Sequence, residues 1–419
     1  MFLLYYNLYN MKNQSKSIIK LLFINLLLIS CTNNGPTENK TCKDMPLGDE
    51  ASLLVFDLNE MPELSTANLS EIGAIAIEYI PLQTTSLSAI SRINNIIFGN
   101  SYFLTYDYTN VKMFNYDGSF VTRVGTKGRG PTEYMGVADV DINPENESVY
   151  IASGEKFLVY SKNGEFVRTF KNPQKSDSKN FRFTEDGILC YYFNNFGNIV
   201  NSYILMDTIG NVIKEYPNRY PWKRRAPGVF YQGENLFYKF DNQLFKKEIY
   251  CDTIFSFKDK VFEPHMVIDV GKRRLTPDIR SKFRTNPDFS EKAYKSYLTP
   301  WNLFEFGDFI YYEMIMVLNG AENLFSFIGS KRDNFRALIV PEQGMNDDLY
   351  GGPYIWPRTI KGDSIIISWI EAMKYREYIA SDAFEKSNPK FPDKKEELER
   401  LADKLKDTDN PILVLVRLN

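Results

Sequence analysis

Apolar and polar residues alternate along most of the chain in short runs, and turns rich in glycine and asparagine separate these runs. Residues 115–134 show the pattern most clearly, because Tyr116-Asp117-Gly118 lies between two alternating runs. A glycine turn between alternating runs predicts a β-hairpin, since glycine supplies the positive φ that tight hairpin turns require. The pattern therefore predicts an all-β chain of many short strands.

The hairpin recurs with a constant period. The turn glycines Gly118, Gly164 and Gly210 follow one another at intervals of 46 residues, and an apolar pair comes two and three positions after each of them. A repeat of this length with about four strands is typical of a β-propeller blade. From residue 72 to residue 370 the period predicts a six-bladed β-propeller. Five or seven blades stay open as alternatives, because the last three repeats are irregular.

The end of the chain departs from this pattern. Residues 371–406 are rich in charge and have helical spacing, so they predict a short C-terminal helical addition. Residues 411–418 then form an apolar run that predicts a closing strand, and we expect this strand to pair with an N-terminal strand. Such pairing closes the ring, and closure matters because an open propeller leaves strand edges without partners.

The first residues predict a targeting segment. Residues 1–31 have a lysine-containing start and an apolar stretch that is too short to span a bilayer, so they are not part of the fold. The stretch ends in Leu28-Ile29-Ser30-Cys31, which resembles the lipobox of bacterial lipoproteins, a family in which this cysteine carries the lipid. The alternative is an ordinary signal peptide in which Cys31 is incidental. Residues 32–50 are polar and predict a flexible tether to a propeller over residues 51–419.

Composition excludes several classes of protein. The net charge of −3 offers no basic excess, so no nucleic-acid partner is expected. The chain has one histidine, His265, and none of its four cysteines is spaced as CxxC. Neither a multi-histidine metal site nor a zinc or redox motif is therefore predicted, and no cofactor is expected. Whether Cys190 and Cys251 pair stays open, and His265 lies in a strand-like run where we expect a structural role.

One short stretch begins like a calcium-binding loop, at Asp139-Val140-Asp141-Ile142-Asn143. The likeness ends at Pro144, where an EF-hand has its glycine, and at Tyr150, where it has glutamate. We therefore expect a strand and a turn here, with no metal.

Four stretches together resemble the six-bladed β-propeller lipoproteins of Bacteroidetes, a family related in architecture to NHL-repeat propellers. These stretches are residues 78–82 (EYIPL), 124–134 (VGTKGRGPTEY), 252–254 (DTI) and 410–414 (NPILV). Gly128-Arg129-Gly130-Pro131 is the most specific of the matches, although Thr132 stands where the family usually has glycine. The resemblance implies the fold and an envelope location. It implies no particular activity, because propellers host binding proteins and enzymes alike.

The glycine-rich loop at residues 125–134 is the main candidate site. Lys127 and Arg129 lie among its glycines, so their charges are expected to project from a tight loop. Glu133 is expected to pair with Arg129 or to help hold a ligand, with Tyr134 beside it. In the structural alternative the loop is a connector between blades, in which Glu133 caps backbone amides and Tyr134 packs.

A second candidate combines aromatic and basic residues around Trp222 and Arg224. An aromatic face beside polar groups suits stacking on a sugar, and it suits packing between blades equally well. The basic clusters at residues 223–225 and 272–274 are either solvated loops or a contact for an anionic ligand, such as an acidic glycan or a phospholipid surface. The aromatic stretch at residues 348–356 has the same two interpretations.

These observations predict an envelope-anchored β-propeller that binds a glycan, a peptide or an envelope protein at its loop-lined face. The anchor would be a lipid on Cys31, and the outer membrane is the expected location. The periplasmic face is favoured because residues 32–41 lack an acidic cluster.

Two alternatives to a binding protein remain. The first is a lyase or hydrolase acting at the central channel, in which Arg129 stabilises an anion and Glu133 or Tyr134 transfers a proton. The second is a structural subunit of an envelope assembly. No residue pattern dictates a chemistry, so no catalytic residue is assigned and the oligomeric state is not predicted.

Overall fold

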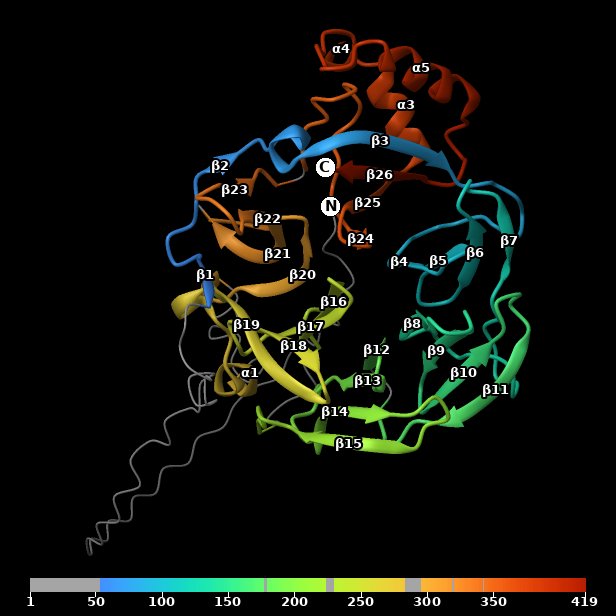
Figure 1. Ribbon diagram of the computed structural model, residues 1–419, viewed down its shortest axis with the longest axis vertical. Helices are drawn as coiled ribbons and strands as arrows, with labels where there is room; N and C mark the ends of the chain where they lie inside the picture. Colours follow the sequence, from blue (N-terminus) through green and yellow to red (C-terminus); the bar gives the residue numbers. More distant parts are fainter. Residues whose placement is uncertain (1–52, 177–178, 224–229, 283–294, 319, 342) are drawn as a thin grey trace, which may run out of the picture. The chain divides into compact units, whose positions relative to one another are not determined.

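The computed structural model describes residues 53–176, 179–223, 230–282, 295–318, 320–341 and 343–419. The predicted signal peptide and tether, with Cys31, lie outside these residues. Six β-sheets stand in a ring around a common axis (Figure 1). The chain is therefore a six-bladed β-propeller, as the repeats predict. Blades I to VI are numbered in chain order from strand β4.

Blades I, II and III each consist of four consecutive antiparallel strands, and the first strand of each lies nearest the axis. The strands of blade I are β4 (Asn95–Phe98), β5 (Tyr102–Tyr106), β6 (Val111–Asn115) and β7 (Phe120–Arg123). Those of blade II are β8 (Asp139–Ile142), β9 (Val149–Ser153), β10 (Lys156–Tyr160) and β11 (Phe166–Lys171). Those of blade III are β12 (Lys179–Thr184), β13 (Gly187–Tyr192), β14 (Asn201–Met206) and β15 (Val212–Pro217).

Blades IV and V have four consecutive strands and a fifth, N-terminal strand that pairs in parallel with the outermost one. The strands of blade IV are β16 (Asn235–Phe240), β17 (Gln243–Glu248), β18 (Thr253–Lys258) and β19 (Val261–Asp269), with β1 (Leu54–Asp57). Those of blade V are β20 (Thr299–Phe306), β21 (Phe309–Leu318), β22 (Ala321–Ser330) and β23 (Arg336–Ile339), with β2 (Leu64–Ser65).

Blade VI closes the ring. It combines β24 (Thr359–Lys361), β25 (Ile365–Ile370) and the C-terminal β26 (Ile412–Leu418) with the N-terminal β3 (Ala74–Pro81). Strands β26 and β3 are antiparallel over their whole length. The predicted pairing of the closing strand with an N-terminal strand is thus confirmed, and it closes the ring within one sheet.

The predicted helices are inserted within blade VI. Helices α3 (Ala372–Ile379), α4 (Asp382–Glu385) and α5 (Lys394–Lys404) all lie between β25 and β26. They pack together around a small apolar cluster that includes Tyr375, Phe384 and Leu398. Helix α1 (Pro277–Lys282) and the 3-10 turns η2 (Leu69–Ile72) and η3 (Gly271–Arg273) are further short helical elements.

The turn glycines have two reasons to be glycine. Gly118, Gly164 and Gly210 have φ values of 83°, 82° and 96°, which side chains with a Cβ rarely adopt. Each also lies against the preceding blade. A Cβ on Gly118 would come 2.3 Å from the Pro81 carbonyl oxygen, and one on Gly164 would come 2.8 Å from Thr122. The sequence period therefore marks the positions where each blade meets its predecessor.

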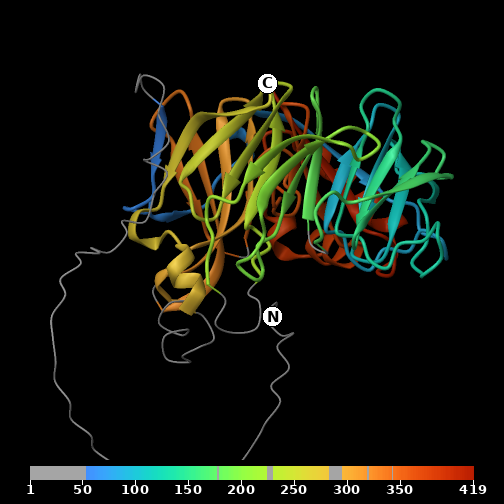
Figure 2. The same cartoon turned by 90° about the horizontal axis from the view of Figure 1, so that it is seen from below.

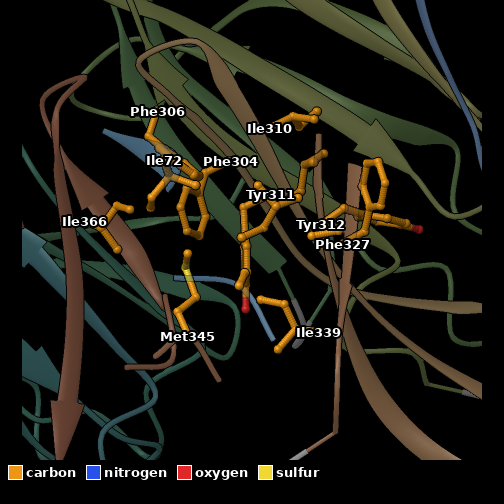
Figure 3. Packing of buried hydrophobic residues seen from close by; sticks show 14 of the residues in the cluster. Ile72, Phe304, Phe306, Ile310, Tyr311, Tyr312, Phe327, Ile339, Met345 and Ile366 are labelled. Atoms are coloured by element: carbon orange, nitrogen blue, oxygen red, sulfur yellow. The ribbon is translucent and has the colours of Figure 1, made fainter. Parts of the chain in front are cut away.

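Neighbouring blades pack against each other and bury the sheets from both faces. Strands β5, β9 and β14 are buried along their whole length, whereas the outer strand β15 is mostly exposed. Figure 3 shows the largest apolar cluster, where Phe304, Tyr311 and Phe327 of blade V pack near Ile366 of blade VI and Met345. The core is thus a chain of clusters between blades.

The two ends of the ring carry different kinds of loop. Within a blade, the links between first and second strands and between third and fourth strands all lie at one end, which we call the turn end. The links between second and third strands, and the connectors from each blade to the next, lie at the other end, which we call the connector end. Helix α1 and the inserted helices of blade VI lie on this side (Figure 2).

Candidate functional site

Exposed apolar side chains distinguish the connector end. In the loops and inserted helices of the described chain, large apolar residues that are exposed gather at this end: Leu87, Tyr108, Met135, Phe196, Val200, Phe230, Tyr354, Met373 and Phe391. In the described loops of the turn end, Ile209 is the one large apolar residue that is exposed. Exposed apolar residues concentrated on one face are typical of interaction sites. The connector end is therefore the candidate binding surface.

The predicted loop at residues 125–134 lies at the connector end, between β7 and β8. Its backbone folds back on itself, because the Tyr134 N–H donates to the Thr126 carbonyl (3.1 Å) and the Gly128 N–H donates to the Tyr134 carbonyl (3.0 Å). The Glu133 carboxylate accepts a hydrogen bond from the Gly130 N–H at 2.7 Å. A Cβ on Gly128 would come 1.9 Å from the same carboxylate oxygen, so a larger residue at this position would displace the Glu133 side chain.

The four site residues that the sequence predicts in this loop differ in exposure. Lys127 and Arg129 are exposed, Glu133 is half-buried and Tyr134 is buried. Burial raises the pKa of Tyr134 to about 12, which makes its phenol a poor proton donor or acceptor at neutral pH. Glu133 caps a backbone amide and Tyr134 packs in the interior. These are the contacts expected if the loop serves as a connector between blades. Ligand binding by the two exposed cations stays a prediction.

Trp222 belongs to a buried cluster in the connector between blades III and IV. Its Nε1–H donates to the Asn194 carbonyl at 2.9 Å, and the Arg280 guanidinium lies 4.9 Å from its ring centroid. Arg280 also pairs with Glu234 at 2.7 Å and lies 5.2 Å from the Tyr231 ring. The indole face is thus covered by a protein cation. Arg224, the other predicted residue of this candidate site, lies outside the described residues.

His265 joins a polar network between blades IV and V. Its Nε2 lies 2.8 Å from Glu305 Oε1, and the same carboxylate accepts hydrogen bonds from Tyr238 and Lys331. Burial favours a raised Glu305 pKa, but the bonds from His265 and Lys331 outweigh it and lower the pKa below its ordinary value. The network holds two blades together.

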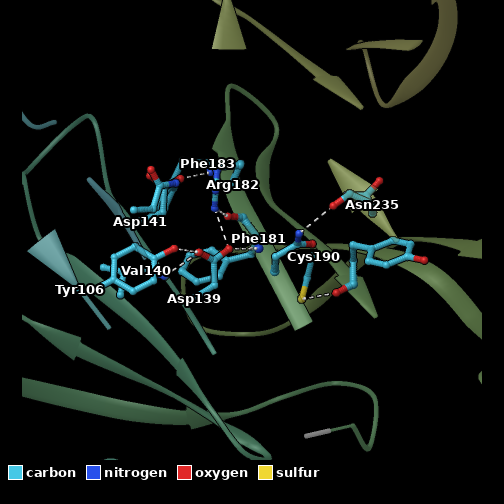
Figure 4. A network of polar contacts seen from close by, with 12 residues as sticks. Tyr106, Asp139, Val140, Asp141, Phe181, Arg182, Phe183, Cys190 and Asn235 are labelled. Atoms are coloured by element: carbon cyan, nitrogen blue, oxygen red, sulfur yellow. Dashed lines mark hydrogen bonds and ion pairs between the residues drawn. The ribbon is translucent and has the colours of Figure 1, made fainter. Parts of the chain in front are cut away.

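The predicted strand and turn at residues 139–143 are confirmed, since Asp139 and Asp141 lie in β8. Their carboxylates reach across to the next blade (Figure 4). Asp139 Oδ2 accepts hydrogen bonds from the Phe181 N–H (2.9 Å) and the Arg182 guanidinium (2.7 Å). Asp141 Oδ2 accepts one from the Phe183 N–H at 2.8 Å. These aspartates accept hydrogen bonds from backbone N–H groups on the edge of β12 that has no neighbouring strand.

A related pair joins blades V and VI. Glu313 of β21 is 1% exposed, and its Oε1 accepts hydrogen bonds from Tyr311 (2.8 Å) and from Trp356 Nε1. Arg358 Nη1 lies 4.0 Å from the same oxygen, and the guanidinium faces the rings of Trp356 and Trp369 at 5.2 and 5.8 Å. Burial raises the pKa of Glu313, and Arg358 opposes this effect.

The sequence reasoning missed both residues of this pair. One signal was available for Glu313, which is the lone charge in the apolar strand FIYYEMIMVL. A carboxylate inside such a strand predicts a buried group with a partner. Arg358 has no local signal, because the contact depends on the packing of two blades.

The structure also bears on the cysteines, on metal binding and on membrane-spanning helices. Cys251 is disulfide-bonded, whereas Cys190 is free and buried, so these two cysteines do not pair with each other. Within the described ranges, no group of three or more His, Cys, Asp or Glu side chains is arranged to hold a metal ion. None of the helices in these ranges is long and apolar enough to cross a membrane.

Comparison with known proteins agrees with the fold. The profile of one protein family, described as Domain of unknown function (DUF4934), matches residues 53–417. No functionally curated protein matches the sequence. A crystal structure of a Bacteroides fragilis protein described as exported aligns with 17% identity and a TM-score of 0.67, over 88% of this chain and 100% of the other.

More distant structures also align. A Bacteroides caccae protein of unknown function has 10% identity and a TM-score of 0.35, over 59% of this chain and 81% of the other. The WD40 domain of Neurospora crassa Pan2 has 10% identity and a TM-score of 0.32, over 60% of this chain and 66% of the other.

Proposed function

The chain belongs to the DUF4934 family, and on this premise we propose that it is an exported, envelope-anchored propeller that binds a glycan, peptide or envelope protein at its connector end. The observation that carries the proposal is the unequal distribution of exposed apolar side chains between the two ends of the ring. Six blades hold the connector loops in place, and such rigid scaffolds commonly present binding loops.

Three observations support an envelope location. The Leu28-Ile29-Ser30-Cys31 stretch resembles a lipobox, and Cys31 is the proposed lipid attachment site at the outer membrane. Cys251 is disulfide-bonded, which suits an oxidising compartment outside the cytosol. The Bacteroides fragilis structure with the same fold is described as an exported protein. A relation to NHL-repeat lipoproteins and the periplasmic face remain parts of this proposal.

Replacement of exposed residues at each end tests the binding surface. We expect Met135→Ser combined with Phe196→Ser, both at the connector end, to weaken capture of the partner from solubilised envelope membranes. The control is Ile209→Ser at the turn end, which removes one apolar side chain whose exposure lies between those of Met135 and Phe196. Equal capture by wild type and the connector-end variant, with all three proteins folded, would contradict the proposal.

A thermal-shift screen identifies the ligand class. Glycans, peptides and envelope extracts are added to the mature protein, and a ligand at 100 times its Kd should add about 2.7 kcal/mol to the free energy of unfolding. The shift should decrease in an Arg129→Ala/Lys127→Ala variant if the glycine-rich loop takes part. Lipidation is tested separately, because Cys31→Ala should move the protein from the membrane fraction to the soluble fraction.

A further inference from the structure

At the junction of blades V and VI, two polar atoms lack a hydrogen-bond partner among the residues that the structure describes. They are Glu313 Oε2 and Arg358 Nε, and both are shielded from solvent. Within the part of the chain that the structure describes, neither takes part in a hydrogen bond. The closest approach of the pair is 4.0 Å, between Arg358 Nη1 and Glu313 Oε1. A buried carboxylate oxygen and a buried guanidinium N–H that both lack a hydrogen bond point to a bound group that is not part of the described chain.

The charges of the pair define that group. An anion would bond to Arg358 but would face the Glu313 carboxylate, and a cation would face Arg358. A hydroxyl fits both, because its O–H donates to Glu313 Oε2 while its oxygen accepts from Arg358 Nε–H. The aromatic rings of Trp356 and Trp369 flank the guanidinium, and such rings suit the apolar C–H face of a sugar.

The two members of the pair differ in burial, because Glu313 is 1% exposed and Arg358 is partly exposed. Hydrogen bonds from Tyr311 and Trp356 hold the Glu313 carboxylate in place. The Arg358 side chain is 32% exposed, so this side of the junction borders solvent, from which a hydroxyl group can approach the pair. The connector that leads into Arg358 also carries the exposed Tyr354, which is one of the apolar residues of the connector end.

We propose that a hydroxyl group of a neutral carbohydrate binds between Glu313 and Arg358, with Trp356 and Trp369 beside the sugar ring. This inference rests on the proposed binding function and narrows its ligand to a neutral glycan. It also separates this position from Trp222, because Trp222 is buried whereas Trp356 and Trp369 are partly exposed.

The test is titration of the mature protein with neutral hexoses, N-acetylglucosamine and their short oligomers, followed by calorimetry and tryptophan fluorescence. We expect Arg358→Ala and Glu313→Gln each to weaken binding about tenfold or more, which is the order of effect of losing a hydrogen bond to a charged group. The fluorescence response should disappear in Trp356→Phe and persist in Trp222→Phe. Arg182→Lys, which changes a pair that is already closed, should leave the affinity unchanged.

Several outcomes would overturn the inference without touching the proposed function. One is neutral sugars binding with equal affinity to wild type, Arg358→Ala and Glu313→Gln. Another is tighter binding of uronic acids than of the matching neutral sugars, since the charge argument excludes an anion. A third is no sugar binding at all in a protein that captures a peptide or an envelope protein at its connector end. The proposed function itself fails only if replacing the exposed connector-end residues changes no capture.

Discussion

Two junctions between blades use the same chemical groups in different ways. Between blades II and III, Asp139 and Arg182 are 2.7 Å apart, and both carboxylate oxygens accept hydrogen bonds within the protein. Between blades V and VI, Glu313 and Arg358 approach only to 4.0 Å, and one polar atom of each has no partner among the described residues. The first junction is complete by itself, whereas the second leaves these two polar atoms open to the hydroxyl group that we propose.

The difference has an energetic meaning. A buried polar atom without a hydrogen bond costs about 1–3 kcal/mol, so a junction with two such atoms is less stable than it could be. Binding sites commonly accept such a cost, because the missing bonds are made when the ligand arrives. We therefore expect the first junction to contribute to stability and the second to binding. The predictions below are ordered from the largest expected effect on stability to the smallest.

Opening the ring should have the largest effect, because both junctions depend on it. Deletion of residues 410–419 removes β26 from between β25 and β3, and it also removes the Asn410 side chain that bonds to Gln83 and Ile90 in the next connector. We expect loss of cooperative unfolding, measured by circular dichroism on heating. A deletion variant that melts like wild type would contradict the closure account.

Breaking the complete junction should come next. Asp139→Ala leaves the Arg182 charge without its carboxylate and the Phe181 N–H without its acceptor. Removing one partner of a buried ion pair costs about 3–5 kcal/mol, and we expect a loss of this order in urea unfolding. Asp139→Asn is the companion variant, because it keeps the shape and should fold if the alanine variant does not. A decrease of less than about 1 kcal/mol in the free energy of unfolding would be typical of a solvent-exposed ion pair and would contradict the account.

A third junction supplies a pH test. The Glu305 pKa is lowered in the folded protein by His265 and Lys331, which outweigh burial. A carboxyl group with a lowered folded pKa stabilises the protein at pH values above its unfolded pKa, near 4.5, and this contribution is lost as the pH falls through the folded pKa. The difference in unfolding free energy between wild type and Glu305→Gln should therefore be largest near neutral pH and shrink in acid. A difference that stays constant from neutral to acid pH would contradict the role of this carboxylate.

The smallest effect on stability is expected at the open junction. Arg358→Ala removes a side chain that is 32% exposed and 4.0 Å from its nearest carboxylate oxygen, so the loss should stay below about 1 kcal/mol. Urea unfolding of Arg358→Ala beside Asp139→Ala makes the comparison direct. Similar losses in the two variants would show that the junctions do not differ in the way described.

The sequence predicts the fold well because the fold repeats. The spacing of Gly118, Gly164 and Gly210 marks real turns, and the apolar run at residues 411–418 is the closing strand. The later blades are irregular in sequence because β21 and β22 are 10 residues long and N-terminal strands are added to blades IV and V. The helices are predicted between the last repeat and the closing strand, and the structure has them there, within blade VI, because β26 returns to the sheet after them.

The candidate site is harder to predict, because its contacts join residues that are distant in sequence. Asp139 contacts Arg182 in the next blade, and Glu313 contacts Arg358 across another blade boundary. No local motif shows which of these carboxylates keeps an unused oxygen. The glycine-rich loop stands out in the sequence because of its glycines. In the structure Gly128 lies close to the Glu133 side chain, so the glycines reflect the folding of the loop on itself.

Hydrogen–deuterium exchange with and without neutral oligosaccharides tests the contrast between the two junctions most directly. We predict slower exchange at residues 356–361 when sugar is added, because Arg358 becomes held between Glu313 and the ligand. Exchange at residues 139–142 should stay the same, because that junction is already complete. Unchanged exchange at residues 356–361, or protection of both junctions alike, would contradict the account.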